Sequence, residues 1–259
     1  MAFETIETRV EGTRGELVLN RPQKLNALDR RTLVELAEAA RWFNGQPGIK
    51  VVVVSGNGSS FSAGADVSAF AGEDPGPEQR RAGADAGRLM AEAIQRMDAV
   101  TVARIHGYCI GGAVVLAAAC DLRLAGETAV FSIPEVDLGI PLAWGGIPRL
   151  VREIGPAMTR ELVLTCRRFS AAEARELGFI NRVVPDDELA STVEELVEVL
   201  LEKSRLTLLA TKRAVEAASE EMLATAGAWS DADSLLTALE DPESRRSAEA
   251  YLRRVTRRG

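Results

Sequence analysis

The chain has 259 residues, of which 46% are hydrophobic and 27% are charged. This length and composition fit one large folded domain, or one domain with an appendage, and exclude disordered and collagen-like chains. The formal net charge of −7 argues against a nucleic-acid-binding protein, because affinity for phosphates depends on clustered Lys and Arg.

The N-terminal part of the chain alternates between strand and helix patterns. Two short β runs joined by a turn at 12–15 come first, and a helix is predicted over 27–44 with Asp29 as its N-cap. The β-branched run at 50–56 is typical of a strand buried on both faces. The segment 71–87 is rich in Gly, Pro and charged residues, so we predict a loop there.

The same alternation continues in the second part of the chain. Helix, strand, glycine turn, helix and strand are predicted in this order at 87–97, 99–105, 107–112, 113–119 and 121–125. This order predicts an α/β fold rather than a helix bundle or a β-sandwich. From 157 onward the sequence is typical of helices, and 186–258 is helical and heavily charged.

The few cysteines and the single histidine exclude several classes of active site. Cys109, Cys120 and Cys166 form no C-x-x-C pair, so we interpret them as buried reduced thiols in a reducing compartment. The single histidine, His106, argues against zinc sites with several His ligands and against Ser–His–Asp hydrolases. The N-terminus lacks the layout of a signal peptide and no apolar run reaches about 18 residues, so we expect a cytoplasmic chain without membrane contact.

Two glycine turns, 61–66 (FSAGAD) and 107–112 (GYCIGG), each follow an apolar strand and precede a predicted helix. A helix N-terminus presents unpaired N–H groups, and small residues let a ligand approach the backbone closely. Two such turns from adjacent strands can direct two N–H donors at one oxygen, which makes an oxyanion hole. The alternative is that both are ordinary strand-to-helix turns. Neither carries the glycine pattern of a phosphate-binding or dinucleotide-binding loop.

Four ordered motifs resemble the crotonase (enoyl-CoA hydratase/isomerase) superfamily. They are NRPQKLNAL at 20–28, FSAGADV at 61–67, HGYCIGGA at 106–113, and Pro134-Glu135-Val136 leading to Gly139. The resemblance covers essentially the whole chain. It implies a spiral of repeated ββα units over 1–190 and a helical region over 191–259 that assembles a homotrimer or a dimer of trimers. It also implies an acyl-CoA thioester as the substrate, with no further cofactor and no metal.

The resemblance also assigns residues to the site. The two main-chain donors would come from Ala63 and Gly112, and they would stabilise the enolate formed from the thioester. Tyr251 and Arg254 would reach the CoA of a neighbouring subunit. The remaining positions implied to contact CoA are Lys24, Ala27, Leu28, Gly64, Ala65, Asp66, Val67, Gly111 and Pro134.

The catalytic carboxylates depart from the family pattern. Hydratases of the family hold one water between two glutamates; the second corresponds to Glu135, but the first corresponds to Val115. Valine cannot transfer a proton. The sequence therefore favours isomerisation of a 3-enoyl-CoA to a 2-enoyl-CoA, with Glu135 moving the proton from C2 to C4. In an apolar pocket the pKa of this carboxyl should rise toward neutral pH.

Several alternatives stay open. The chain could be a hydratase, could catalyse another enolate reaction such as decarboxylation or thioester hydrolysis, or could bind acyl-CoA without catalysis. Asp137 and two acids of the predicted loop, Asp74 and Asp85, are candidates to assist. Phe70 and Trp144 are interpreted as pocket wall or core.

Overall fold

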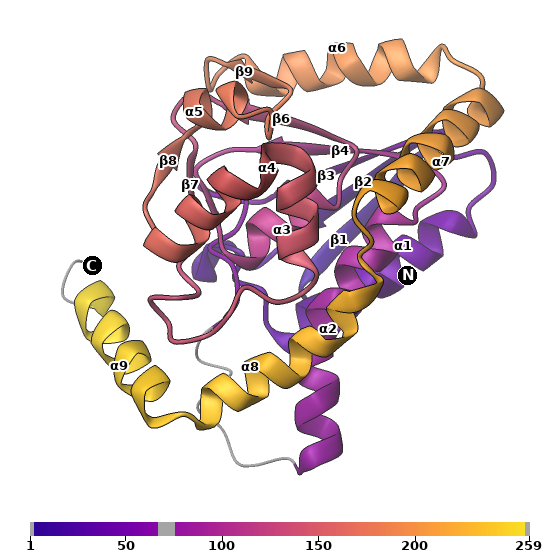
Figure 1. Cartoon of the computed structure of the whole chain (residues 1–259). Coiled ribbons are helices and arrows are strands. Elements are labelled where there is room, and N and C mark those ends of the chain that lie inside the picture. The colour runs from indigo at the N-terminus through magenta and orange to yellow at the C-terminus, as the bar shows by residue number, and fades with distance from the viewer. Residues whose placement is uncertain (1–2, 67–75, 257–259) are drawn as a thin grey trace.

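The structure is a computed structural model that describes residues 3–66 and 76–256, without the side chains of 255 and 256 (Figure 1). In this part of the chain the main sheet has six strands in the order β1-β2-β3-β4-β6-β9. They are β1 (Ile6–Glu11), β2 (Arg14–Leu19), β3 (Val51–Gly56), β4 (Val100–Ile105), β6 (Leu122–Gly126) and β9 (Arg182–Val184). β1 pairs antiparallel with β2, and the later pairs are parallel.

A smaller sheet contains β5 (Tyr108–Ile110), β7 (Val130–Ser132) and β8 (Phe169–Ser170). β5 follows β4, and β7 follows β6, so successive turns of the chain add one strand to each sheet. This arrangement confirms the predicted spiral of ββα units. β5 lies within the segment predicted only as a glycine turn, because its backbone partners come from β7, which no local pattern reveals.

Helices cover both faces of the main sheet. Along β3 the side chains alternate, so that Val52 and Val54 pack in the larger core while Val51 and Val53 face the opposite side. The larger core is covered by α1 (Arg30–Asn44), α2 (Pro77–Gln95), α3 (Gly112–Ala118), α4 (Gly146–Thr165) and α5 (Ala171–Glu176). α1 begins at Asp29, as predicted, because its carboxylate accepts a hydrogen bond from the Thr32 N–H at 2.8 Å.

The prediction of a loop over 71–87 is wrong for its second half, which forms the start of α2. Pro77 occupies the first helical turn, where its missing N–H costs nothing. Arg88 donates to Asp85 and to Glu92, each at 2.6 Å, one turn before and one turn after it. These spacings let charged residues stabilise a helix, so the high charge of the segment supports helical structure.

The C-terminal helices are α6 (Leu189–Leu201), α7 (Arg205–Met222), α8 (Asp231–Glu240) and α9 (Pro242–Thr256). Short 3-10 turns lie at Pro22–Lys24 and Ala226–Ser230. Val193 and Val197 of α6 pack against Val51 and Val53 on the second face of the sheet. The division of the chain into 1–190 and 191–259 stays a prediction. Among the described residues no helix is long and apolar enough to cross a membrane.

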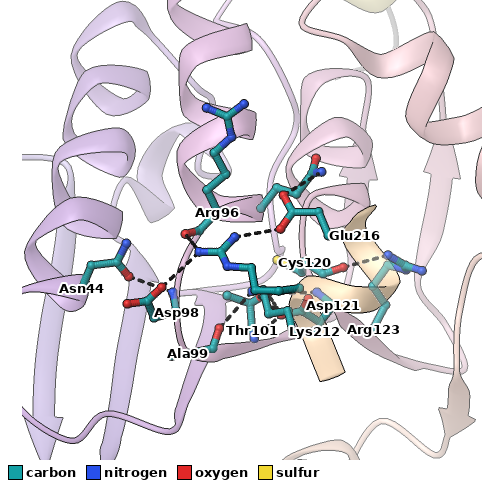
Figure 2. Close-up of polar contacts among 12 residues, drawn as sticks. Asn44, Arg96, Asp98, Ala99, Thr101, Cys120, Asp121, Arg123, Lys212 and Glu216 are labelled. Atoms are coloured by element: carbon teal, nitrogen blue, oxygen red, sulfur yellow. Dashed lines mark hydrogen bonds and ion pairs between the residues drawn. The ribbon is translucent and has the colours of Figure 1, made fainter. Parts of the chain in front are cut away.

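α7 is attached to the sheet by polar contacts. Along this helix, whose residues are all described, Lys212 alone is buried. Its ammonium group donates to the Ala99 carbonyl at 3.0 Å and to the Asp121 carboxylate at 2.7 Å, and Asp121 also accepts from the Thr101 N–H and hydroxyl (Figure 2). The buried charge is therefore fully paired, which a stable fold requires.

Candidate active site

The two glycine turns lie side by side, as their positions after adjacent strands predict. The Ser62 N–H donates to the Tyr108 carbonyl at 2.9 Å, and the Ile110 N–H donates to the Ser62 carbonyl at 3.2 Å. Gly64 has a φ of +85°, and a Cβ added there would lie 2.3 Å from the Ile110 carbonyl oxygen. A glycine is therefore required where the two turns meet.

One of the two predicted main-chain donors needs correction. The Ala63 N–H donates to the Leu25 carbonyl at 2.9 Å, so it is not available to a substrate oxygen, which contradicts the role predicted for Ala63. The Ala65 N–H, two residues later, has no hydrogen-bond acceptor in the described part of the chain. The same holds there for Gly112, the first residue of α3. Ala65 in one turn and Gly112 in the other therefore each have a free N–H group.

Glu135 lies directly beside the glycine pair, Gly111 and Gly112, at the start of α3. The Gly111 N–H donates to the Ser132 carbonyl at 2.8 Å, which holds the end of β7 against this turn. A Cβ on Gly111 would lie 2.5 Å from the Glu135 Oε1, so the missing side chain makes room for the carboxyl. Glu135 is 8% exposed, and its Oε2 has no hydrogen-bond partner among the described residues. Burial raises its pKa to about 7.

The position of the other family glutamate is apolar. Val115 is fully buried in α3, and its Cγ2 would lie 2.9 Å from a Cβ on Gly146, close to Leu142. These neighbours offer no group that could transfer a proton in place of a glutamate. Among the described residues, Glu135 thus supplies the one carboxyl at the glycine pair.

The other acids near the site carry cationic partners. Asp66 pairs with Arg21 at 3.0 Å, and Asp137 pairs with Arg254 at 2.6 Å. Of the three acidic residues that line the cavity in the described structure, Glu135 alone lacks a cationic partner.

The two acids of the predicted loop do not join this site in the described structure. Asp85 lies on α2 and is engaged by Arg88. Asp74 and Phe70 lie outside the described residues.

A cavity of about 680 Å³ opens beside Glu135. Most of the residues predicted to contact CoA line it: Ala27, Ala63, Gly64, Ala65, Asp66, Gly111, Pro134, Tyr251 and Arg254. Three of the predicted contacts do not line it: Lys24 is exposed at the surface, whereas Leu28 and Gly112 are buried. Val67 lies outside the described residues.

The C-terminal helix lies against the cavity of its own chain. Tyr251 and Arg254 of α9 line this cavity, and the Arg254 guanidinium lies 5.4 Å from the centre of the Tyr251 ring. A Cβ on Gly139 would lie 2.2 Å from the Ser244 carbonyl, so α9 begins in close contact with the loop after Glu135. We predicted that this segment reaches a neighbouring subunit, whereas here it lies on its own chain. The chain turns sharply between α8 and α9 (Figure 1).

Some residues of the cavity were not predicted. Cys109 and Cys120 are buried as predicted, whereas Cys166 is half-buried and lines the cavity together with Ile140. Cys166 ends α4 with a φ of +53°, a conformation that the surrounding sequence does not indicate. His106 is half-buried and hydrogen-bonded to the Gly58 carbonyl at 3.0 Å, which agrees with the structural role expected for it.

Comparisons with known proteins identify the family. Residues 11–257 match the model of the enoyl-CoA hydratase/isomerase family. A crotonyl-CoA hydratase of Syntrophomonas wolfei is 36% identical over 215 residues, which cover 83% of this chain and 82% of that protein. A peroxisomal Delta(3,5)-Delta(2,4)-dienoyl-CoA isomerase of Arabidopsis thaliana is 35% identical over 245 residues, 89% of this chain and 88% of that protein.

The fold leads to the same family. The crystal structure of an enoyl-CoA hydratase from Bacillus halodurans superimposes with a TM-score of 0.87 at 26% identity, over 95% of this chain and 100% of that one. The chain therefore belongs to the enoyl-CoA hydratase/isomerase family, and the predicted crotonase fold is confirmed. It is an enzyme of a family whose members act as hydratases, dehydratases or isomerases.

Proposed function

We propose that this enzyme converts 3-enoyl-CoA to 2-enoyl-CoA thioesters, with Glu135 as its sole acid–base group. The observation that carries the proposal is the carboxyl of Glu135, which is buried, unpaired at Oε2 and has a pKa of about 7 beside the glycine pair. A carboxyl that titrates near neutral pH can accept a proton and return it, which is what an allylic shift requires. Val115 removes the second carboxyl that a hydratase would use.

In the proposed reaction the thioester oxygen accepts hydrogen bonds from the Ala65 and Gly112 N–H groups. The Glu135 carboxylate takes a proton from C2, and the electrons of the C–H bond form an enolate that these two donors stabilise. The enolate then re-forms the carbonyl, the double bond moves from C3–C4 to C2–C3, and C4 takes the proton from Glu135. The carboxylate is regenerated and no water or other reactant is consumed.

The cavity suits a CoA ester as the substrate. Ala27, Ala65 and Asp66 line one side, while Tyr251 and Arg254 of α9 line another. Arg168 and Arg254 both line the cavity and supply positive charge for an anionic ligand, which would share Arg254 with Asp137. We propose that CoA lies along this cavity. The reaction needs no cofactor besides the CoA that belongs to the substrate, and no metal.

Hydration is the second candidate, because a crotonyl-CoA hydratase is among the similar proteins. A single carboxyl cannot both position a water and protonate the adjacent carbon in the way that two can. The deciding experiment compares 3-hexenoyl-CoA and crotonyl-CoA as substrates of the unmodified enzyme. We expect isomerisation to exceed hydration by a wide margin; a faster hydration would reverse the proposal.

Val115→Glu is expected to increase the hydration of crotonyl-CoA. The change places a carboxyl on α3 at the position that corresponds to the first glutamate of the family pattern, and a positioned acid–base group contributes about 10²–10⁴-fold to a rate. We expect a gain near the lower end of this range, since Val115 is packed against apolar neighbours. Val115→Gln is the matched control, with the same size and no titratable proton. Equal hydration rates in the two folded variants would contradict the assigned role of position 115.

We also propose that the chain assembles as a homotrimer or a dimer of trimers through the region 191–259. Val215 and Met222, two turns apart on one side of α7, support this, because they are 62% and 79% exposed. Clustered apolar side chains at a surface mark a contact with another protein surface. Sedimentation velocity at micromolar protein is expected to show a trimer or hexamer, and a uniform monomer would exclude this assembly.

A further inference from the structure

The indole of Trp144 fills the space that two glycines leave open. A Cβ added to Gly87 of α2 would lie 2.0 Å from the Trp144 Cδ2, and one added to Gly112 would lie 2.1 Å from its Cζ3. The two rings of the indole therefore press on the backbones of two different helices. Any larger residue at either glycine would displace the ring, so these three residues form one packing unit.

This packing unit adjoins the reaction centre. Gly111 meets the Glu135 carboxyl, and the next residue, Gly112, meets the indole. The carboxyl and the indole thus flank the same glycine pair. Gly111 and Glu135 line the cavity, and Trp144, which is not a lining residue, adjoins it through its contact with Gly112.

The backbone at Trp144 is held in an unfavourable conformation. Its φ is +63°, in the left-handed region that bulky residues rarely adopt. The buried Arg149 donates to the Trp144 carbonyl at 3.3 Å and to the Gly145 carbonyl at 3.0 Å. The Gly145 N–H donates to the Asp231 carboxylate at 2.8 Å. Contacts from two helices therefore hold the bend that points the indole at the two glycines.

We propose that Trp144 sets the acyl-chain length of the substrate by closing the acyl end of the cavity. This inference rests on the proposed function, because it takes the thioester oxygen to lie at the Ala65 and Gly112 N–H groups. With the oxygen there, the carbons beyond the reacting C2–C4 segment run toward the space that the indole occupies. The preferred substrates are then short-chain 3-enoyl-CoA thioesters, and a small residue at position 144 would make room for longer ones.

Binding of saturated acyl-CoAs tests this inference without any catalytic step. Butyryl-, octanoyl- and dodecanoyl-CoA are titrated calorimetrically into the wild-type protein and into Trp144→Ala. We expect no gain in affinity from butyryl- to octanoyl-CoA in the wild type. In Trp144→Ala the affinity should rise about 4-fold for each methylene that the opened space accepts, since burying one methylene is worth about 0.8 kcal/mol.

Controls separate this effect from a general loss of structure. Trp229→Ala removes an exposed indole elsewhere and should leave the chain-length profile unchanged. Trp144→Phe, a smaller reduction, should give an intermediate profile. Gly87→Ala should lower the melting temperature of the wild type and be tolerated in Trp144→Ala, because the added methyl then has space.

The outcomes distinguish the two proposals. If every acyl-CoA binds but the chain-length profile is the same in the wild type, Trp144→Ala and Trp144→Phe, the role of Trp144 is overturned and the proposed function stands. If no CoA ester binds to the folded wild type, the proposed function fails, and this inference fails with it.

Discussion

Glu135→Gln is expected to lower the turnover of 3-enoyl-CoA by about 10²–10⁴-fold, the usual contribution of a positioned acid–base group. Glutamine keeps the size of the side chain but cannot carry a proton from C2 to C4. Affinity for butyryl-CoA should change little, because the Ala65 and Gly112 N–H groups and the cavity are unaltered. Steady-state rates and calorimetric titration measure the two quantities separately. Full activity in the folded variant would remove Glu135 from the mechanism.

The pH dependence of the wild type provides an independent measurement on the same carboxyl. Burial raises the pKa of Glu135 from an ordinary value near 4.5 to about 7. The carboxylate is the form that takes the proton from C2, so kcat/KM should rise about tenfold per pH unit below pH 7 and level off above it. A flat profile between pH 5 and 8 would show that a group with this pKa does not limit the reaction.

The same raised pKa predicts how stability changes with pH. The folded state binds the Glu135 proton more tightly than the unfolded state, so this contribution is fully present below about pH 4.5 and is lost as pH rises through 7. Glu135→Gln has no such loss. Its free energy of unfolding minus that of the wild type should therefore be about 2–3 kcal/mol larger at pH 8 than at pH 5, which means that the variant gains relative stability as pH rises. Urea unfolding at both pH values tests this.

Local patterns predicted those elements whose stabilising contacts lie close in sequence. Asp29 caps α1 through a residue three positions away, and the apolar run of β3 needs only burial on both faces. The position of Glu135 in an apolar pocket was also predicted, from its place in the motif.

Contacts between residues far apart in the sequence account for the features that the sequence did not predict. β5 exists because β7 supplies its backbone partners, and α9 lies on its own cavity because the chain turns after α8. The packing of Trp144 likewise depends on Gly87 and Gly112, which are far from it in the chain and which no local pattern reveals.

The choice between Ala63 and Ala65 shows this limit most clearly. Both are alanines in the same glycine turn, and sequence alone does not say which N–H is free. The acceptor that occupies the Ala63 N–H is the carbonyl of Leu25, in a segment that reaches this turn only in the folded chain. In the structure the free N–H is therefore that of Ala65 and not that of Ala63, and deleting each N–H in turn tests which one the reaction uses.

Replacing the peptide bond before Ala65 by an ester, which removes the N–H and leaves the side chain, is expected to lower kcat/KM by about 10²–10³-fold. Loss of one oxyanion-hole donor costs about 2.7–4 kcal/mol of transition-state stabilisation. The effect should appear in kcat, because the donor acts most strongly on the charge that develops in the enolate. Single-turnover measurements with 3-hexenoyl-CoA would separate this step from binding.

The same ester placed before Ala63 is the matched control. It removes the hydrogen bond to the Leu25 carbonyl, so it should lower the free energy of unfolding by about 1 kcal/mol while leaving kcat close to that of the wild type. Each ester also weakens one carbonyl acceptor, Gly64 for the Leu28 N–H or Ser62 for the Ile110 N–H, so both variants carry this second change and the deleted N–H remains the main difference. If the ester at Ala63 abolishes turnover and the ester at Ala65 does not, the oxyanion hole is built from Ala63, and the hydrogen bond to Leu25 must break when substrate binds.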